Sequence, residues 1–484
     1  MSSTDKPKVN NEVRPGATRL EKDSIGELAV PVEAYYGVQT MRAIQNFPIS
    51  GIPMPARFIQ THALLKRAAA EVNHDLGQLD DKLYQAITQA ASEIEAGGFA
   101  DQFPIDIFQT GSGTSTNMNV NEVIASRANE LLGGKPGDKS PVHPNDHVNM
   151  GQSSNDTIPT TLYLSALIPM EQDLRPALKL LEESLRKKSV EFWDVIKTGR
   201  THLQDATPIR LGQEFLGYAG QIERAQKRLD DAKRELSEVA LGGTAVGTGV
   251  NMHPEFARRV LAKVSDWLGM EIRESDNHFQ SQNAIDGAVL ASGVMKTIAV
   301  SLMKIANDFR WMASGPRAGI GEIIVPAVQP GSSIMPGKVN PVIAESATMV
   351  AAQVFGYDTT ITLAGQSGNF ELNVMLPVAA YNLSEQIRLL ANTCRNLAVQ
   401  CVDGIVATDQ GIKMLEQGLL LATPLAPVIG YDKTANIVKT ALKTNRTVRE
   451  VAKELSGLPQ EELDVLLDPA AMTEPGVQTG SSGG

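Results

Sequence analysis

The chain has 484 residues, of which 42% are hydrophobic, so it can bury a large core and should form two or three domains. Its 44 basic and 55 acidic residues give a net charge of −11, which argues against a general nucleic-acid-binding protein. The first residues contain no apolar run resembling a secretory signal or a membrane span, so we expect a cytoplasmic protein with no membrane partner.

Polar and apolar residues divide the chain into five segments. The two ends are polar and irregular or rich in glycine and serine, and we predict disordered tails over residues 1–18 and 473–484. Between them we predict a mostly helical N-terminal domain over residues 19–151. A central long-helix bundle domain over 152–410 carries a glycine- and proline-rich loop, and a small helical domain over 411–472 follows.

Two motifs in the first third of the chain are rich in short polar side chains. They read QTGSGTSTNMN over Gln109–Asn119 and QSSND over Gln152–Asp156. Short hydroxyl and amide groups suit the binding of a carboxylate on which charge develops during a reaction. The candidate binding residues are Ser112, Thr114, Ser153, Ser154 and Asn155.

Between these motifs lies the sequence HPNDHVN over His143–Asn149. Two histidines four residues apart would share one face of a helix and could hold a metal ion. Here Pro144 lies between His143 and His147 and disrupts such a face. We therefore predict no metal site.

The dominant pattern after residue 155 is helical. Apolar residues recur at spacings of three and four through 160–197, 211–240, 283–313, 342–364 and 378–409. The polar face between Ile285 and Met312 is narrow, which indicates burial on nearly all sides, in the core of one chain or in a bundle shared by several copies. Cys394 and Cys401 lie seven apart in a helical pattern and should be two buried thiols rather than a disulfide.

Two polar segments interrupt the helical pattern. Gly199–Pro208 contains Thr201 and His202, and a histidine with a pKa near ~6.5 can exchange a proton under working conditions. Gly242–Gly249 lacks the glycine spacing of a dinucleotide-binding loop, and the residues before it have a helical rather than a strand pattern. We predict that it forms a tight turn near the active site.

The loop GSSIMPGKVNP, Gly331–Pro341, is the most informative segment of the chain. Two glycines and two prolines exclude a helix interior. Lys338 can hold an anion, Asn340 can donate and accept, and Ser332 or Ser333 can exchange a proton if its hydroxyl is activated. A nucleotide-binding P-loop is excluded, because Val339 follows the lysine where a hydroxyl would hold magnesium.

Taken together, the loop and the motifs at 109–119, 143–156 and 199–208 resemble the fumarase/aspartase superfamily, lyases that eliminate water or an amine from succinyl-type substrates. The resemblance runs from about Arg19, through YYGVQT at Tyr35–Thr40, to Asp432. It implies a mainly α, fumarase/aspartase-like fold whose long central helical bundle is shared in a homotetramer. It also implies active sites shared between subunits, and no metal or other cofactor.

The resemblance further implies roles for individual residues. Ser332 matches the family's catalytic base, although the residues alone also allow Ser333 or a purely structural cap. His202 matches an active-site histidine paired with an acidic residue equivalent to Glu345, which would orient substrate and relay a proton. The other implied substrate-binding residues are Ser112, Thr114, Ser153, Ser154, Asn155, Thr201, Ser333, Lys338 and Asn340, and a second dicarboxylate-binding position would use His143, Asn145 and Asp146.

Within the superfamily, local sequence favours a class II fumarase, which reversibly hydrates fumarate to L-malate in the citric acid cycle. Ser112 and Ser154 stand where aspartases more usually have alanine and threonine, and Ser367–Asn373 has the fumarase form. Tyr35–Thr40 and Asn373–Pro377 look partly aspartase-like, so aspartate ammonia-lyase is the alternative. A non-enzymatic role is disfavoured, because every matched position carries a chemically competent residue.

Overall fold

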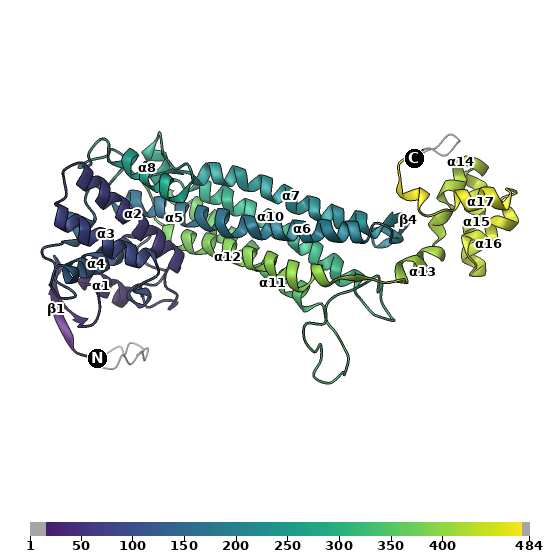
Figure 1. The fold of residues 1–484 in the computed structure, drawn as a ribbon, viewed down its shortest axis with the longest axis horizontal. Helices are drawn as coiled ribbons and strands as arrows, with labels where there is room; N and C mark the ends of the chain where they lie inside the picture. The colour runs from purple at the N-terminus through teal and green to yellow at the C-terminus, as the bar shows by residue number, and fades with distance from the viewer. Residues whose placement is uncertain (1–15, 477–484) are drawn as a thin grey trace, which may run out of the picture. The chain divides into compact units, whose positions relative to one another are not determined.

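The computed structural model describes residues 16–476 and is mainly α-helical, as predicted (Figure 1). In this part of the chain, the strands form only two-stranded pairs. Most of the predicted tails, residues 1–15 and 477–484, lies outside the described residues. At the edges of the described part, Thr18 begins strand β1 and Ala471–Thr473 forms a 3₁₀ turn.

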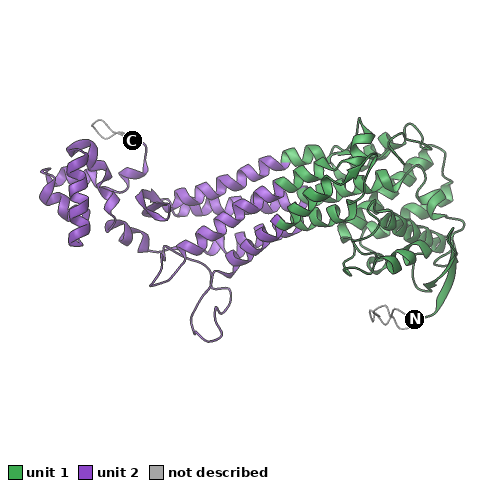
Figure 2. Cartoon of the chain, turned by 180° about the vertical axis from the view of Figure 1, so that it is seen from behind, with its two compact units in different colours: residues 1–170, 230–293, 356–387 green, residues 171–229, 294–355, 388–484 purple. Residues whose placement is uncertain are grey.

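The chain divides into two compact units (Figure 2). Unit 1 contains residues 1–170, 230–293 and 356–387, and unit 2 contains residues 171–229, 294–355 and 388–484. The boundary falls inside four long helices, which contribute residues to both units: α7 (Leu211–Leu236), α10 (Asp286–Met312), α11 (Val342–Gly365) and α12 (Leu376–Gln400). The predicted domain limits at 151 and 410 follow chain order instead, and they stay a prediction.

Unit 1 is built around α2, which packs against α3, α5 and α8. Helix α2 is buried on most of its surface, and polar residues such as His62 and Lys66 are enclosed together with the apolar ones. The elements of unit 1 are β1 (Thr18–Lys22), β2 (Glu27–Pro31), α1 (Val38–Asn46), α2 (Ala56–Asp75), α3 (Asp81–Glu95), η1 (Ala100–Gln102), α4 (Thr114–Leu131), the π-helical turn η2 (Pro144–Val148), α5 (Ser154–Pro169), β5 (Glu238–Val239), α8 (Phe256–Leu268), β6 (Arg273–Glu274), α9 (His278–Asn283), β8 (Gly368–Asn369) and β9 (Leu372–Asn373).

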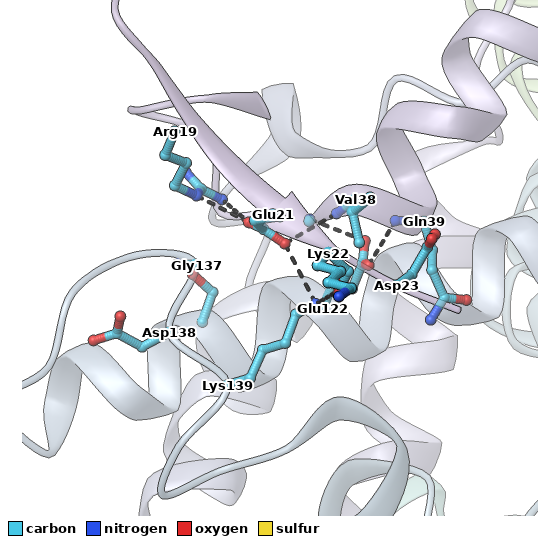
Figure 3. Close-up of polar contacts among 12 residues, drawn as sticks. Arg19, Glu21, Lys22, Asp23, Val38, Gln39, Glu122, Gly137, Asp138 and Lys139 are labelled. Carbon is cyan, nitrogen blue, oxygen red and sulfur yellow. Dashed lines mark hydrogen bonds and ion pairs between the residues drawn. The ribbon is translucent and has the colours of Figure 1, made fainter. Parts of the chain in front are cut away.

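The YYGVQT motif begins helix α1, and two carboxylates hold this helix start (Figure 3). Buried Glu122 accepts hydrogen bonds from the backbone nitrogens of Gly37 (2.9 Å) and Thr40 (3.1 Å) and from the Thr40 hydroxyl (2.6 Å). Glu21 accepts from the nitrogen of Val38 at 3.1 Å. A Cβ at position 37 would lie 2.9 Å from both carboxylates, so a larger residue there would displace them from the helix start.

Unit 2 contains the antiparallel β3–β4 hairpin and a separate group of C-terminal helices around its own apolar core, which includes Leu425 and Val451. Within the unit, Phe215 of α7 stacks on Phe309 of α10 and meets Phe192 edge to face. The elements of unit 2 are α6 (Arg175–Glu191), β3 (Ile196–Thr201), β4 (Gln204–Arg210), β7 (Ile323–Ile324), η4 (Val402–Gly404), β10 (Val406–Ala407), α13 (Gln410–Glu416), η5 (Leu419–Leu425), α14 (Ala426–Ile429), α15 (Tyr431–Thr444), α16 (Val448–Leu455), α17 (Gln460–Leu466) and η6 (Ala471–Thr473).

The long helices lie close to their predicted positions, with one early end and one interruption. Helix α12 ends at Gln400, whereas the predicted helix continues to residue 409 through η4 and β10. The predicted helix over 160–197 is divided into α5 and α6 by the π-helical turn η3 (Met170–Leu174), which follows Pro169. Helix α10 has the length and mean hydropathy (1.5) of a membrane span, and the bent pair Gln410–Glu416 and Leu419–Ile429 passes the same test only when taken together. Half of the apolar window of α10 is buried within the chain, as in a core helix of a bundle.

Candidate active site

The starts of helices α4 and α5 bring together predicted binding residues from two distant motifs. The hydroxyls of Ser112 and Thr114 are hydrogen-bonded at 2.8 Å, and Thr114 is hydrogen-bonded to the hydroxyl of Ser154 at 2.7 Å. The Ser154 hydroxyl also donates to the amide oxygen of Asn155 at 3.4 Å. This continuous chain of hydroxyls can reorganise its protons to donate to an incoming anion.

Ser153 has a different local role, because its side chain caps helix α5. Its hydroxyl accepts from the nitrogen of Asn155 at 3.2 Å, and Asp156 closes a capping box by accepting from the Ser153 nitrogen at 2.9 Å. Asp156 also accepts from the nitrogens of Gly242 (3.2 Å) and Thr244 (2.9 Å). Burial raises the pKa of the Asp156 carboxyl, and these hydrogen bonds oppose that rise.

The glycine-rich segment 242–249 therefore forms a turn against the start of α5. Gly242 has a positive φ of 112°, and the amide nitrogen of Asn155 donates to the carbonyl oxygen of Ala245 at 2.8 Å. The contact restricts the Asn155 side chain.

The predicted second dicarboxylate position lies in η2, where Pro144 begins a single π-helical turn. The Nδ1 atom of His143 accepts from the backbone nitrogens of Asn145 and Asp146, both at 3.3 Å. The Asp146 carboxylate lies 3.3 Å from the same ring nitrogen. Within residues 16–476, no group of three His, Cys, Asp or Glu side chains is placed to hold a metal ion.

In unit 2, Thr201 and His202 lie at the tip of the β3–β4 hairpin. Thr201 pairs with Gln204, so His202 and Leu203 form a two-residue turn with positive φ angles of 57° and 58°. Glycine and asparagine normally occupy such positions, because other side chains are strained there. The strained turn holds the His202 side chain out from the strands, in an exposed position.

Below this tip, β3 is anchored by a buried charge network that the sequence did not indicate. Lys197 contacts Glu214 and Glu322, each at 2.9 Å, and its side chain is only 2% exposed. Arg200 contacts Glu322 at 2.8 Å. Because unpairing any of these charges in a buried place is costly, the network fixes the strand that leads to Thr201.

A cavity of about 450 Å³ in unit 2 lies beside this network. Of the described residues around it, none belongs to the predicted site. They are Lys197, Arg200, Leu203, Gln213, Glu214, Gly217, Tyr218, Gln221, Lys304, Asp308, Trp311, Met312 and Ile320.

The loop 331–341 also lies in unit 2 and places Ser332 in a distinctive environment. The Ser332 hydroxyl oxygen accepts from the backbone nitrogens of Met335 (2.9 Å) and Ile334 (3.2 Å). Two donors stabilise an ionised oxygen more than a neutral one and so lower its proton affinity. The neighbouring Ser333 is exposed and has no such contact among the described residues.

The base of the same loop is closed by short hydrogen bonds. The amide of Asn340 donates to the carbonyl oxygen of Gly331 at 2.6 Å, and the Gly331 nitrogen donates to the carbonyl oxygen of Lys338 at 2.9 Å. Gly337 takes the positive φ of 80° that the turn requires. The Lys338 side chain is left exposed at the end of an ordered turn.

Glu345 lies in the first turn of α11, where its backbone nitrogen donates to the carbonyl oxygen of Pro341 at 3.0 Å. Among residues 16–476 of a single chain, no hydrogen bond or ion pair joins Glu345 to His202. The predicted constellation is therefore divided. Unit 1 carries the hydroxyl chain and the η2 turn, and unit 2 carries His202, Glu345 and the loop.

Comparison with known proteins identifies the class. A family model described as "Lyase" matches residues 26–356, and one described as "Fumarase C C-terminus" matches residues 421–474. The fumarate hydratase class II of Nitrosomonas europaea is 51% identical over 94% of this chain and 99% of its own, and that of Neisseria meningitidis is 50% identical over 95% and 99%. The crystal structure of a class II fumarase from Schistosoma mansoni superposes with a TM-score of 0.92 at 39% identity, over 94% of this chain and 99% of that chain.

The fold is thus that of the fumarase-type lyases. The chain belongs to this lyase family and, within it, to the class II fumarate hydratases.

Proposed function

We propose that the chain catalyses the reversible hydration of fumarate to L-malate in the citric acid cycle, in the cytoplasm. The observation that carries the proposal is the 51% identity to a class II fumarate hydratase over nearly the full length of both chains. The hydroxyls of Ser112 and Ser154, which favour fumarase over aspartase, lie in one hydrogen-bonded chain through Thr114.

In the direction from malate, Ser332 acts as the base. Its ionised oxygen, held by the nitrogens of Ile334 and Met335, takes a proton from the carbon next to one carboxylate. The electron pair left on that carbon is delocalised into the carboxylate, which becomes an aci-carboxylate. Lys338 and Asn340 donate to this group and stabilise it more than the ground state.

In the second step, the carbon–oxygen bond on the neighbouring carbon breaks on the opposite face, and the double bond of fumarate forms. The departing hydroxide takes a proton and leaves as water. His202, supported by Glu345, orients the substrate and relays this proton. Hydration is the reverse of both steps, so addition and elimination are anti, and the chemistry uses no cofactor.

The remaining binding residues are neutral, which keeps ground-state attraction modest while they fix the two carboxylates and the hydroxyl group of malate. We assign this role to Ser112, Thr114, Ser153, Ser154, Asn155, Thr201 and Ser333. We assign the accessory dicarboxylate position to His143, Asn145 and Asp146, which lie together at η2, where the backbone nitrogens of Asn145 and Asp146 donate to the His143 ring.

The assembly we propose is a homotetramer with active sites shared between subunits. The lack of a hydrogen bond or ion pair between His202 and Glu345 within residues 16–476 of one chain fits a site in which another copy supplies one of the two. Large apolar side chains on the long helices of unit 2, such as Val300 (54% exposed) and Met349 (67% exposed), also favour burial by another copy.

The test is to follow the absorbance of fumarate when the purified protein is given L-malate, beside a parallel sample given L-aspartate, in metal-free buffer. We expect fumarate from malate alone. Fumarate from aspartate alone would mean that the protein is an ammonia-lyase and not a hydratase. It would also show that Ser112 and Ser154 do not discriminate fumarases from aspartases.

A further inference from the structure

A lysine is completely buried beneath the substrate-binding segment of unit 1. Lys66 on helix α2 is 0% exposed, and its Nζ donates to Asn149 Oδ1 at 2.9 Å and Gln152 Oε1 at 3.0 Å. Both acceptors are neutral amides. Burial of an ammonium group without direct contact to a carboxylate is costly, so a lysine at this position requires a reason beyond packing.

The two acceptors belong to the short segment that joins η2 to helix α5. Asn149 Oδ1 also accepts from Asn117 (3.2 Å) and Asn121 (3.0 Å), while its own amide nitrogen donates to the carbonyl oxygen of Gln152 at 3.1 Å. The Gln152 amide nitrogen in turn donates to the carbonyl oxygens of Val148 (3.2 Å) and Met150 (3.1 Å). The cation therefore holds the chain immediately before Ser153, where the binding residues begin.

The groups around Lys66 leave its charge largely uncompensated. Asp156 from α5 is the carboxylate that acts on it, and the hydrogen bonds of Asp156 go to backbone nitrogens at Ser153, Gly242 and Thr244. His62, one turn earlier on α2, lies 2.6 Å from the Thr161 hydroxyl, and burial lowers its pKa to about 3, so it is neutral at physiological pH.

Other charges near α2 are paired elsewhere. Arg67 of α2 contacts Glu95 of α3 at 3.0 Å. Lys263 of α8 contacts Glu71 (3.4 Å) and Asp75 (3.2 Å). Among the described residues, none of these charged side chains is hydrogen-bonded to Lys66.

We propose that Lys66 is a positioning residue for the dicarboxylate: it holds the 149–152 segment against α2 and places a positive charge beneath the neutral donors Ser153–Asn155. The inference rests on the proposed function, because it assumes that these donors bind a dianion. It gives a strongly acidic chain a second attractive charge besides Lys338, one that does not contact substrate. Burial lowers the pKa of Lys66 to about 7, so the charge is present below neutral pH and is lost above it.

The test is the variant Lys66→Met in the full-length, assembled protein. Loss of a charge that attracts the ground state and the transition state alike should raise KM for L-malate about tenfold and change kcat less than threefold. In the wild type, KM should also rise between pH 6.5 and 8.5 as Lys66 loses its proton, and the variant should lose this dependence. A KM within twofold of the wild type, or a retained pH dependence, overturns the proposal.

Lys188→Met is the matched control. Lys188 is also buried, with Nζ donating to the carbonyl oxygen of Ile405 at 2.8 Å and to Glu191 at 2.9 Å, but it lies in unit 2 and touches none of the proposed binding residues. Its loss should lower stability and leave KM unchanged. An equal rise of KM in both variants would mean that loss of Lys66 acts through general destabilisation of the fold, and it would overturn the proposal.

Gln152→Met provides the test if Lys66→Met does not fold, because Gln152 is only partly buried and methionine has a similar shape. It removes one acceptor of Lys66 and should raise KM about threefold; an unchanged KM overturns the proposal. Calorimetric titration of fumarate into the same proteins separates the two hypotheses. Fumarate bound by a wild type that does not turn over malate would refute the proposed function alone, whereas an equal dissociation constant in Gln152→Met would refute the role of Lys66 alone.

Discussion

The hydroxyl of Ser332 is the atom on which the proposed chemistry depends most. Ser332→Ala should lower kcat by roughly a thousandfold, since a positioned general base contributes about that factor, and should leave KM nearly unchanged. Folding should be retained, because the side chain lies on a loop and, among the residues that the structure describes, accepts hydrogen bonds only from the backbone nitrogens of Ile334 and Met335. Initial rates with L-malate measure both constants.

Ser333→Ala is the natural control for this variant, because the neighbouring hydroxyl lacks the two backbone donors. It should affect KM more than kcat. If Ser333→Ala is inactive and Ser332→Ala is active, Ser333 rather than Ser332 is the catalytic base.

Lys338 offers a different kinetic signature, because a cation on a dianionic substrate acts in the ground state as well as the transition state. Lys338→Ala should raise KM and lower kcat, with a combined loss of roughly ten- to a hundredfold in kcat/KM, as expected for a charged hydrogen bond. Lys413 is exposed in the last turn of α13, and Lys413→Ala is a control that should change neither constant. Normal kinetics in Lys338→Ala would place this lysine outside the site.

The proposed binding residues stand out in the sequence, whereas the buried residues that support them do not. Ser112, Thr114 and Ser154 lie in recognisable motifs, and the structure links Thr114 to Ser112 at 2.8 Å and to Ser154 at 2.7 Å. Lys66 and Lys197 occupy single positions in helical or extended patterns, where a lysine is ordinarily solvated. Only tertiary packing makes them buried, so no local pattern could have indicated their role.

At the scale of elements, helix periodicity predicts the existence of the long helices better than it predicts their ends. The patterns over 211–240 and 342–364 correspond to α7 (Leu211–Leu236) and α11 (Val342–Gly365). The pattern over 160–197 continued through Pro169, because a π-helical turn preserves the apolar face while it accommodates the missing backbone donor. The same pattern assigns the first residues of strand β3 to the end of the helix, because Val195 and Ile196 fit both the helical and the strand period.

Helix α2 should make the fold sensitive to acid through His62. Burial lowers the pKa of this imidazole from 6.5 to about 3, so the unfolded chain binds a proton between these pH values and the folded chain does not. The contribution of neutral His62 to the free energy of unfolding is therefore fully present above pH 6.5. It falls as pH decreases toward 3, by up to about 1.4 kcal/mol per pH unit.

Urea unfolding midpoints at pH 7.5 and 5.5 measure this effect. His62→Asn should show a smaller decrease between the two pH values than the wild type, whatever its stability at pH 7.5. His253→Asn, which removes a partly exposed histidine, should leave the wild-type decrease intact. An identical pH dependence in His62→Asn and the wild type would mean that another group causes the acid sensitivity.

At the scale of the whole molecule, the division of the proposed site between two units makes a prediction about assembly. If each active site takes the hydroxyl chain from one subunit and the loop from another, dilution to monomers should abolish activity without covalent change. A concentration series that follows activity and sedimentation together measures this. A fully active monomer would contradict the shared site.

Mixed assemblies provide the sharper measurement. Ser154→Ala disables the unit 1 half of a site and Lys338→Ala disables the unit 2 half, so each homo-oligomer should be nearly inactive. When the two variants are unfolded together and refolded, random assembly gives an intact pair of halves at about one quarter of the sites, because each half is intact with a chance of about one in two. Activity near that fraction of the wild type requires contributions from different subunits, since no single chain in the mixture carries both intact halves. Refolding each variant alone controls for the procedure, and a mixture no more active than the separate variants would confine both halves of every site to one chain.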